Sequence, residues 1–299
     1  MSIPIYTVIQ PAFLASYSAQ GQFPKAVFDF EKQQYTAHWS VQRNSDAHYF
    51  DRAGNLVTVS QNVARRVPNG ANDVLLVEPQ QTNLYPSGQI TYSGMSTTGT
   101  TTFGGMSFLN LTGSGTDYIQ FNAIDTTTIP VDGALCFSAV IAPGTSTTCA
   151  IWLGIGSNGT GRIRYSVDFA TQDISLIGNS DSANIGATLD DLGSGLLRIS
   201  VVSRQISLAS PEQARLTAVD GSLGISQVQA EASTFVSSPI PESTSLRAAE
   251  TLQLAHGSGA SLGIATLSDN TTVEWAIDPA STSSLAPIPS ALIKKIVAY

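Results

Sequence analysis

The stretch RIRYSVDF, residues 162–169, alternates polar or charged side chains with Ile163, Tyr165 and Val167. A period of two places the apolar residues on one face of a β-strand and the polar residues on the other. SQVQAEA, residues 226–232, alternates in the same way. Both segments are therefore predicted to be half-buried strands of an antiparallel sheet.

Strand-like segments of this kind fill the chain between residues 116 and 233. They are short, they are separated by Gly, Asn, Asp or Pro, and no helical periodicity of useful length interrupts them. Many short strands bury their apolar faces by packing two sheets together. We therefore predict an all-β fold, an antiparallel jelly-roll-like β-sandwich.

The flanking regions complete the predicted organisation. Further strands are expected in residues 25–86 and in the tail, where TTVEWAID (271–278) and PIPSALIKKIVAY (287–299) have strand patterns. Residues 87–117 are rich in Gly, Ser and Thr and indicate a loop or a weakly specified sheet edge around the strand FGGMSFLNL (103–111). Residues 1–24, with three prolines, suit an extended N-terminal arm or equally an edge strand. Residues 25–299 are predicted to form one sandwich, with 25–90 as its opening segment.

The charge balance limits the classes of partner that the chain is expected to bind. Lys and Arg number 14 against 22 Asp and Glu, which gives a net charge of −8 without any basic run. Binding to nucleic acid through phosphate contacts is therefore not expected. No apolar stretch approaches the ~20 residues that span a bilayer, so no membrane partner is expected. The start of the chain has no signal-peptide pattern, which predicts assembly in a cytoplasm.

Residues that perform chemistry are scattered. His38, His48 and His256 have no partners at metal-ligand spacing, and no P-loop, dinucleotide fingerprint or nucleophile elbow is present. Glu274 and Asp278 share a strand face at a separation of about 13 Å, whereas a glycosidase pair needs ~5–9.5 Å. We therefore predict no catalytic residue, no cofactor and no metal, and hence no enzyme.

Cys136 and Cys149 lie in adjacent predicted strands joined by a Pro-Gly turn. Two interpretations are open. The cysteines lie close together across a hairpin, or they are two separate buried thiols. Without a secretory context, the buried-thiol interpretation is favoured.

The three tryptophans, Trp39, Trp152 and Trp275, all lie in strand patterns with apolar neighbours. Core packing is therefore favoured over an exposed platform for a sugar ring.

One segment carries a longer pattern. SQVQAEASTFVSSPIPESTSLRAAETL, residues 226–252, resembles a segment of tailed-bacteriophage structural proteins with a concanavalin-like (LamG-like) jelly-roll domain, in which a Gln-x-Glu strand end precedes an aromatic residue, TSYIPT and Arg-Ala-Ala-Asp. The positions that match are Gln229, Glu231, Phe235, Ser238, Pro239, Ile240, Pro241, Arg247, Ala248, Ala249 and Glu250.

Three further segments match the same family in the same order. An Arg-x-Ser-x-x-x-Tyr-Phe-Asp-x-x-Gly segment followed by Asn-x-x-Arg is matched by Arg43, Ser45, Tyr49, Phe50, Asp51, Gly54, Asn62 and either Arg65 or Arg66. LLVEPQQTNLYP (75–86) resembles LLIEESRTNLL, with Glu78, Thr82, Asn83 and Leu84 matching. GSGLLRISV (193–201) keeps Arg198 but lacks the Trp-Tyr pair of the family.

The resemblance covers the chain from about Phe28 to its end. It implies a non-enzymatic virion protein, a capsid or tail appendage that attaches to other virion proteins through its N-terminal arm and forms a homo-oligomer, with a trimer favoured. The alternative is a carbohydrate-binding module that recognises a host surface glycan during adhesion. The implied localisation is the virion, assembled in the host cytoplasm.

The residues that carry the resemblance are interpreted as architectural. They include Arg43, Tyr49, Asp51, Glu78, Asn83, Gln229, Glu231, Pro239, Pro241 and Arg247. Arg247 is further predicted to pair with Glu78 or Glu231.

Overall fold

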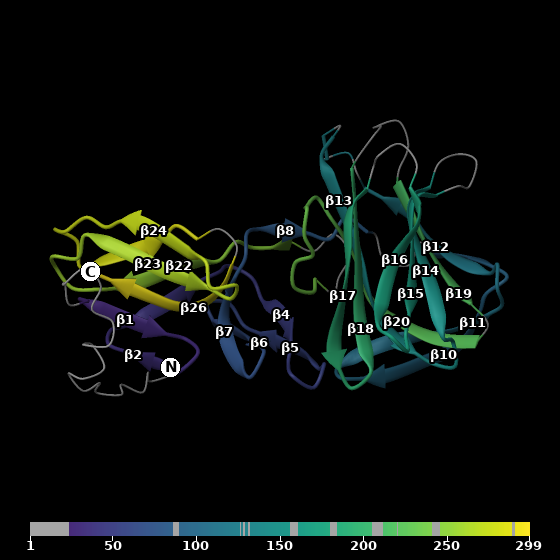
Figure 1. The fold of residues 1–299 in the computed structure, drawn as a ribbon, viewed down its shortest axis with the longest axis horizontal. Coiled ribbons are helices and arrows are strands. Elements are labelled where there is room, and N and C mark those ends of the chain that lie inside the picture. The colour runs from purple at the N-terminus through teal and green to yellow at the C-terminus, as the bar shows by residue number, and fades with distance from the viewer. Residues whose placement is uncertain are drawn as a thin grey trace. The chain divides into compact units, whose positions relative to one another are not determined.

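The computed structural model of the chain describes residues 24–85, 90–125, 127, 129–130, 132–155, 161–179, 184–204, 212–219, 221–240, 246–288 and 291–299. The predicted N-terminal arm therefore lies outside the described residues, apart from Pro24. The secondary structure of these residues consists of β-strands, and their ladders are antiparallel (Figure 1). The predicted all-β sandwich class is thus confirmed. None of the described segments forms a helix that could cross a membrane.

The chain divides into two compact units, where the sequence predicts one sandwich over residues 25–299. The first unit holds the residues up to Tyr49 together with Thr58–Gln80 and Ala248–Tyr299. The second unit holds Phe50–Val57 and Gln81–Arg247. The opening segment and the tail thus fold with each other, because they supply neighbouring strands of one sheet.

In the first unit, a sheet has the order β2 (Gln34–Tyr35), β1 (Ala26–Asp29), β26 (Ala291–Ala298), β23 (Leu262–Leu267) and β24 (Thr272–Ala276). Its β26 also pairs with β7 (Asn72–Val77), which pairs with β6 (Arg65–Asn69). A smaller sheet has the order β25 (Ser283–Ala286), β22 (Thr251–Ala255) and β3 (Trp39–Gln42). Both strands predicted in the tail are therefore present.

The core of the first unit collects apolar side chains from both ends of the chain. Phe28, Phe30, Leu75, Leu254 and Ile296 are fully buried in it. Trp39 and Trp275 are half-buried and pack against this cluster, as predicted.

The second unit is a sandwich of two six-stranded sheets. The β13 sheet has the order β10 (Ser96–Phe103), β11 (Met106–Gly113), β20 (Gly221–Glu231), β13 (Ala134–Pro143), β18 (Leu196–Arg204) and β17 (Asn184–Gly193). The β14 sheet has the order β16 (Asp173–Asn179), β15 (Gly161–Asp168), β14 (Thr148–Ile155), β19 (Glu212–Val219), β12 (Tyr118–Ile124) and β9 (Ile90–Ser93). Two short ladders complete the chain: β8 (Gln81–Thr82) pairs with β21 (Leu246–Arg247), and β4 (Ala47–Phe50) pairs with β5 (Leu56–Val59).

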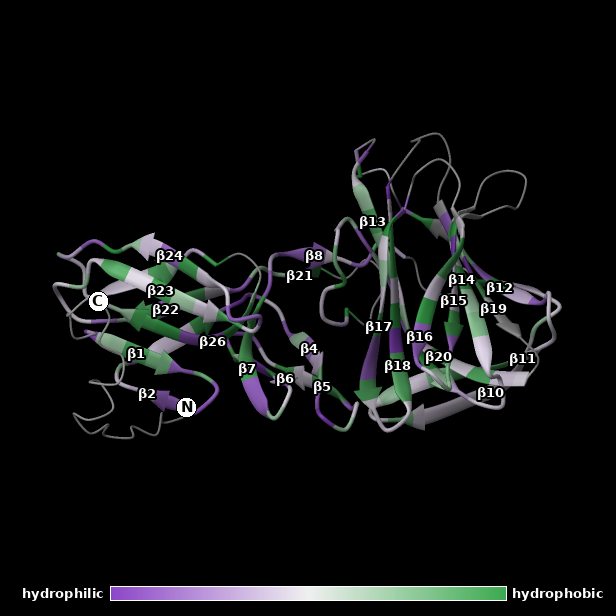
Figure 2. Ribbon diagram, in the orientation of Figure 1, coloured by the Kyte–Doolittle hydropathy of each residue, from purple (hydrophilic) through white to green (hydrophobic). Residues whose placement is uncertain are grey.

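The core of the second unit lies between the two sheets. Ile163 and Val167 are fully buried in it and Tyr165 is nearly so, as the alternation in RIRYSVDF predicts. Phe121 contacts Phe137 across this core with ring centroids 5.3 Å apart. Figure 2 shows that these strands carry both hydrophobic and hydrophilic residues, which fits sheets with one buried face.

The Gly, Ser and Thr-rich segment is a sheet edge with its own strands. β10 is the outermost strand of the β13 sheet, and all eight of its residues are exposed. Its register shifts between Thr97 and Gly99. A bulge and polar side chains are devices that keep an exposed edge from pairing with another chain.

The two cysteines do not face each other across a hairpin. Cys136 belongs to β13 and Cys149 to β14, which are in different sheets, because the turn after Pro143 carries the chain across the sandwich. Both thiols are free and buried, and burial raises the pKa of each to about 12. The buried-thiol interpretation is confirmed.

Candidate functional site

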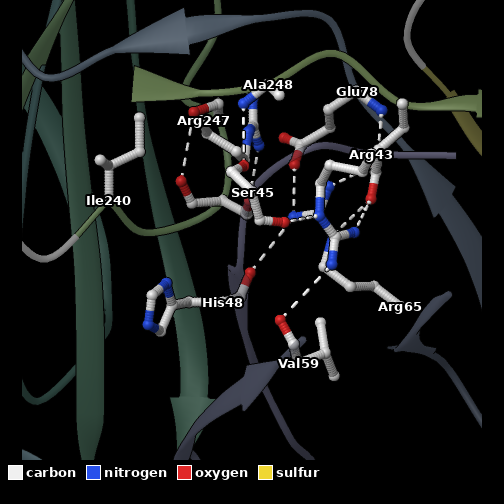
Figure 3. A network of polar contacts seen from close by, with 12 residues as sticks. Arg43, Ser45, His48, Val59, Arg65, Glu78, Ile240, Arg247 and Ala248 are labelled. Carbon is white, nitrogen blue, oxygen red and sulfur yellow. Dashed lines mark hydrogen bonds and ion pairs between the residues drawn. The ribbon is translucent and has the colours of Figure 1, made fainter. Parts of the chain in front are cut away.

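Residues from three of the segments that carry the resemblance meet in a buried ionic cluster of the first unit (Figure 3). The Glu250 carboxylate lies 2.5 Å from Arg43 Nη1 and 2.5 Å from Arg65 Nη2. Arg65 also pairs with Glu78 at 2.7 Å. All four side chains are almost inaccessible to solvent. Buried charges with opposite partners on several sides stabilise one arrangement of the chain, so this cluster has a structural role.

Ser45 belongs to the same region. Its Oγ accepts a hydrogen bond of 3.0 Å from the backbone N–H of Ala248. Arg43 donates further hydrogen bonds to the carbonyl oxygens of Ser45 and Ser60. The Arg-x-Ser and Arg-Ala-Ala-acid patterns thus hold two distant segments of the first unit together.

A second network joins pattern residues of the second unit. Asn83 donates to the carbonyl oxygens of Val228 and Ile240, and its Oδ1 accepts from the backbone N–H groups of Tyr85 and Ala230. Its side chain therefore satisfies every donor and acceptor it has.

Gln229 and Glu231 lie on β20 and are fully buried. Gln229 Oε1 accepts from the backbone N–H of Ile240 at 2.7 Å, and the Glu231 carboxylate accepts from the hydroxyl and the N–H of Ser237. Burial raises the pKa of Glu231, and the hydrogen bonds from Ser237 oppose that shift. These hydrogen bonds hold the segment from Ser237 to Ile240 against β20.

The remaining pattern residues are also placed in turns and short ladders. Tyr49 lies on β4, and Asp51 closes the following turn by accepting hydrogen bonds from Ala53 and Asn55. Arg247 is buried and donates to Ser238 Oγ at 2.6 Å. Pro239 is buried, while Pro241 lies outside the described residues. The predicted pairing of Arg247 with Glu78 or Glu231 stays a prediction.

A charged hollow of about 400 Å³ lies in the first unit. Asp29 pairs with Lys32 at 3.8 Å, and Glu31 pairs with Lys294 at 4.0 Å. Lys294 also donates to Asn270 at 2.8 Å. Lys295 also lines the hollow, so three lysines face two carboxylates there, and the ion pairs engage both acids.

The outward face of the β14 sheet has a different composition. Cys149, Ile151 and Leu153 of β14 point into the core, so Ala150 and Trp152 occupy the opposite face. The same reasoning places Tyr118 and Gln120 of β12, Arg215 of β19 and Arg164 of β15 on this outer face. Most of these side chains are half-buried and reach solvent.

Five residues stand side by side across the β14 sheet, one on each of five neighbouring strands. Gln120 is paired with Thr91 and with Arg215, and Trp152 is paired with Arg215 and with Arg164. We call Thr91, Gln120, Arg215, Trp152 and Arg164 the sheet-face row. Because neighbouring strands lie about 4.8 Å apart, the row is about 19 Å long.

Planar side chains in the row are held by stacking and by hydrogen bonds. The Arg164 guanidinium lies over the Trp152 ring, with Cζ 4.8 Å from the ring centroid. The Arg215 guanidinium lies over the Tyr118 ring at 4.2 Å, and its Nε donates to Gln120 Oε1 at 2.7 Å. Gln120 in turn contacts Asn122, which donates to Thr91. The row is therefore an ordered surface of flat groups.

Two donors of the row have no partner within the described part of the chain. The Trp152 indole N–H is buried and makes no hydrogen bond. Arg164 makes no ion pair or hydrogen bond with a described residue and lies against Gly178 of β16, where a Cβ atom would stand 2.7 Å from its Nε. A half-buried guanidinium without a hydrogen-bonding partner in that part of the chain, set among flat polar side chains, makes this face a candidate binding site.

Sequence reasoning missed this face. Trp152 was expected in the core, and that expectation is wrong, because Trp152 alternates in phase with Ala150 rather than with Ile151 and Leu153. The alternation around TCAIWLGI carries this signal, but the contributions of Arg164, Arg215 and Gln120 depend on strand order. The described residues contain no group of three or more His, Cys, Asp or Glu side chains that could hold a metal ion.

No protein-family model matches the chain, and no curated protein matches it. Solved structures show distant likenesses. The C-terminal family 22 carbohydrate-binding module of Clostridium thermocellum Xyn10B is 16% identical, with 52% of this chain and 94% of that chain covered and a TM-score of 0.32. The CBM22-1 xylan-binding domain of Paenibacillus barcinonensis Xyn10C is 10% identical, with 50% and 90% covered and a TM-score of 0.30. With TM-scores below 0.5, these likenesses carry no argument about this chain.

Proposed function

We propose that the chain is a non-enzymatic carbohydrate-binding protein whose binding surface is the outer face of the β14 sheet. The observation that carries this proposal is the sheet-face row, in which Trp152 lies between two arginines and in line with Gln120 and Thr91. It corresponds to the alternative inferred from the sequence, a module that recognises a host surface glycan.

The chemistry of a sugar matches this surface. The C–H face of a pyranose ring is apolar and packs against flat groups such as the stack that Trp152 forms with Arg164. The hydroxyl groups around the ring edge need hydrogen-bonding partners, and Arg, Gln, Asn and Thr side chains supply donors and acceptors on both sides of the tryptophan. A row of about 19 Å accommodates several sugar units in sequence.

Binding of purified full-length chain to a panel of neutral and acidic polysaccharides tests the proposal. Affinity electrophoresis finds the ligands, and calorimetry on oligosaccharides measures Kd. Trp152→Ala is expected to weaken binding about 30-fold, which is typical of a central aromatic contact. Trp152→Phe, which keeps an aromatic platform, is expected to lose less.

Phe103→Ala is the matched control. Phe103 is an exposed aromatic residue of β10, in the other sheet of the same unit, with 45% of its surface accessible. Its substitution is expected to leave affinity unchanged. Wild-type chain that binds no glycan in the panel, or a folded Trp152→Ala variant with wild-type affinity, would overturn the proposal.

We also propose that the chain acts as a structural protein of a tailed-phage virion. The four sequence segments that resemble that family supply the residues of the two buried networks, for example Arg43 and Glu250 in one and Asn83 and Gln229 in the other. The residues that carry the resemblance are therefore residues on which this fold depends, and this supports the proposal.

Electron microscopy of phage particles labelled with an antibody to the chain tests the virion proposal. Label on the head lattice or at the tail supports it, and particles without label contradict it. Deletion of residues 2–24 is expected to abolish attachment to the particle. Light scattering of the purified chain tests the predicted trimer.

A further inference from the structure

We propose that the sheet-face row selects acidic polysaccharides, with arginine guanidinium groups binding the carboxylates of uronate-type sugars. This inference rests on the proposed carbohydrate-binding function and adds the chemical class of the ligand. It follows from the charges of the row, from their distance to the nearest carboxylates and from the orientation of the arginines.

Positive charge stands on both sides of the aromatic platform. Arg164 and Arg215 are the register partners of Trp152 on its two neighbouring strands. Their Cα atoms are therefore about 10 Å apart, with the indole between them. A sugar packed against the stack of Trp152 and Arg164 therefore has both guanidinium groups nearby.

No carboxylate stands in the row or in the row beside it. The adjacent positions are Tyr118, Thr217, Ala150, Ser166 and Ser175, all of which are neutral. The nearest acidic residues of this face on described strands are Asp168 and Asp173, at the ends of β15 and β16. Asp168 is four positions from Arg164, about 13 Å along the strand. That distance exceeds the screening length of about 8 Å at physiological salt, so these two acids do not neutralise Arg164.

The charge of Arg164 is available to a ligand. Within the described part of the chain, Arg164 stacks on Trp152 without a carboxylate or carbonyl partner. Arg164 is half-buried, and a guanidinium that reaches solvent presents an edge of N–H donors to it. This edge is the one that binds a carboxylate through two parallel hydrogen bonds.

The positive charge of the row contrasts with the negative net charge of the whole chain. The chain carries a net charge of −8, with only 14 Lys and Arg in 299 residues. The composition therefore provides no broad basic surface that would attract any polyanion. Selectivity must come from the geometry of the row. A sugar polymer with ring faces for Trp152 and carboxylates for the arginines satisfies both features.

The experiment compares matched polysaccharides on the full-length chain. Polygalacturonate, alginate and hyaluronan are each tested beside their carboxyl-reduced forms, and dextran and galactan serve as neutral references. We expect at least one acidic polymer to bind about tenfold more tightly than its reduced form, since charge-assisted hydrogen bonds are stronger than neutral ones. Its affinity is expected to fall several-fold between about 50 and about 300 mM NaCl.

Arg164→Gln and Arg164→Lys separate charge from structure. The glutamine variant is expected to lose about tenfold in affinity for the acidic polymer and a clearly smaller factor for the reduced form, because only the acidic polymer loses a charge-assisted hydrogen bond. The lysine variant keeps a charge without the planar fork and is expected to fall between the two. An unchanged melting temperature shows that the variants are folded, and equal losses for the acidic and the reduced polymer would contradict the role assigned to the charge of Arg164.

The outcomes distinguish the two proposals. Equal affinity for acidic and reduced forms, or tightest binding to dextran or galactan, overturns the acidic selectivity and leaves carbohydrate binding in place. Failure of every polysaccharide to bind overturns both proposals. Binding of single-stranded DNA as tight as that of the best acidic glycan also overturns this inference, because arginines and aromatic rings form nucleic-acid surfaces too.

Discussion

Arg65 and Glu250 lie 185 positions apart in the sequence and form a buried ion pair, with Nη2 and Oε2 2.5 Å apart. The same carboxylate accepts hydrogen bonds from Arg43 and from the backbone N–H of Glu78. One side chain from the C-terminal part of the first unit thus satisfies donors on three segments of its N-terminal part. The first unit is therefore expected to need both parts of the chain in order to fold.

Replacing Glu250 with Gln is expected to destabilise the chain strongly. The glutamine has the same size, but it leaves two buried guanidinium groups facing a neutral amide. Removing one partner of a buried ion pair typically lowers the free energy of unfolding by about 3–5 kcal/mol. The free energy of unfolding is measured by urea denaturation.

Glu274→Gln is the matched control for this substitution. Glu274 is an exposed carboxylate on β24 of the same unit. Its change is expected to stay within about 0.5 kcal/mol of wild type. A cost below about 1 kcal/mol for Glu250→Gln would show that the cluster does not hold the first unit together.

Asn83→Asp is expected to destabilise the second unit by about 3 kcal/mol. Asn83 uses both N–H donors on the carbonyl oxygens of Val228 and Ile240. An aspartate presents an acceptor to those two oxygens and loses both hydrogen bonds in a buried position. Thermal and urea unfolding measure the cost.

The control for Asn83→Asp is the same change at Asn270. This asparagine is exposed and uses its Oδ1 as an acceptor from Lys294. An aspartate keeps that acceptor, so little change in stability is expected. Equal effects of the two substitutions would contradict the role assigned to Asn83.

Cys136 and Cys149 are expected to be unreactive in the folded protein. Burial raises the pKa of each thiol to about 12, so neither forms a thiolate at neutral pH. A thiol reagent at pH 8 should detect almost no reactive thiol in the native chain and both cysteines after unfolding in urea. Rapid reaction of either cysteine under native conditions would contradict this burial.

The carboxyl group of Glu231 gives the second unit a defined pH dependence. Burial raises its pKa above the ordinary value of 4.5. The folded state therefore binds this proton more tightly than the unfolded state, and the resulting stabilisation is complete below the unfolded pKa. It is lost as the pH rises through the folded pKa.

Comparison with Glu231→Gln isolates this effect. The wild-type free energy of unfolding, minus that of the variant, is expected to decrease as the pH is raised from about 4 to about 8. Urea denaturation at several pH values measures the difference. A difference that increases with pH would mean that the hydrogen bonds from Ser237 outweigh burial.

Sequence reasoning predicted the elements better than their assembly. The alternation in RIRYSVDF correctly placed Ile163 and Val167 in the core, because the side-chain period of a strand is a local property. The same local view misplaced Trp152, whose neighbours Ile151 and Leu153 are apolar but point to the other face. It also treated β13 and β14 as a candidate hairpin, although the turn between them changes sheets.

The sequence by itself determined that the chain is all-β and which face of most strands is apolar, since both follow from residues next to one another. Its resemblance to a known family also predicted structural roles for Arg43, Glu78 and Asn83. Only the tertiary structure decided that Gln120, Arg215, Trp152 and Arg164 form one row. Their strands β12, β19, β14 and β15 are neighbours because β19 inserts between β14 and β12. Such pairing depends on hydrogen bonds and register between distant segments, which no local pattern of residues specifies.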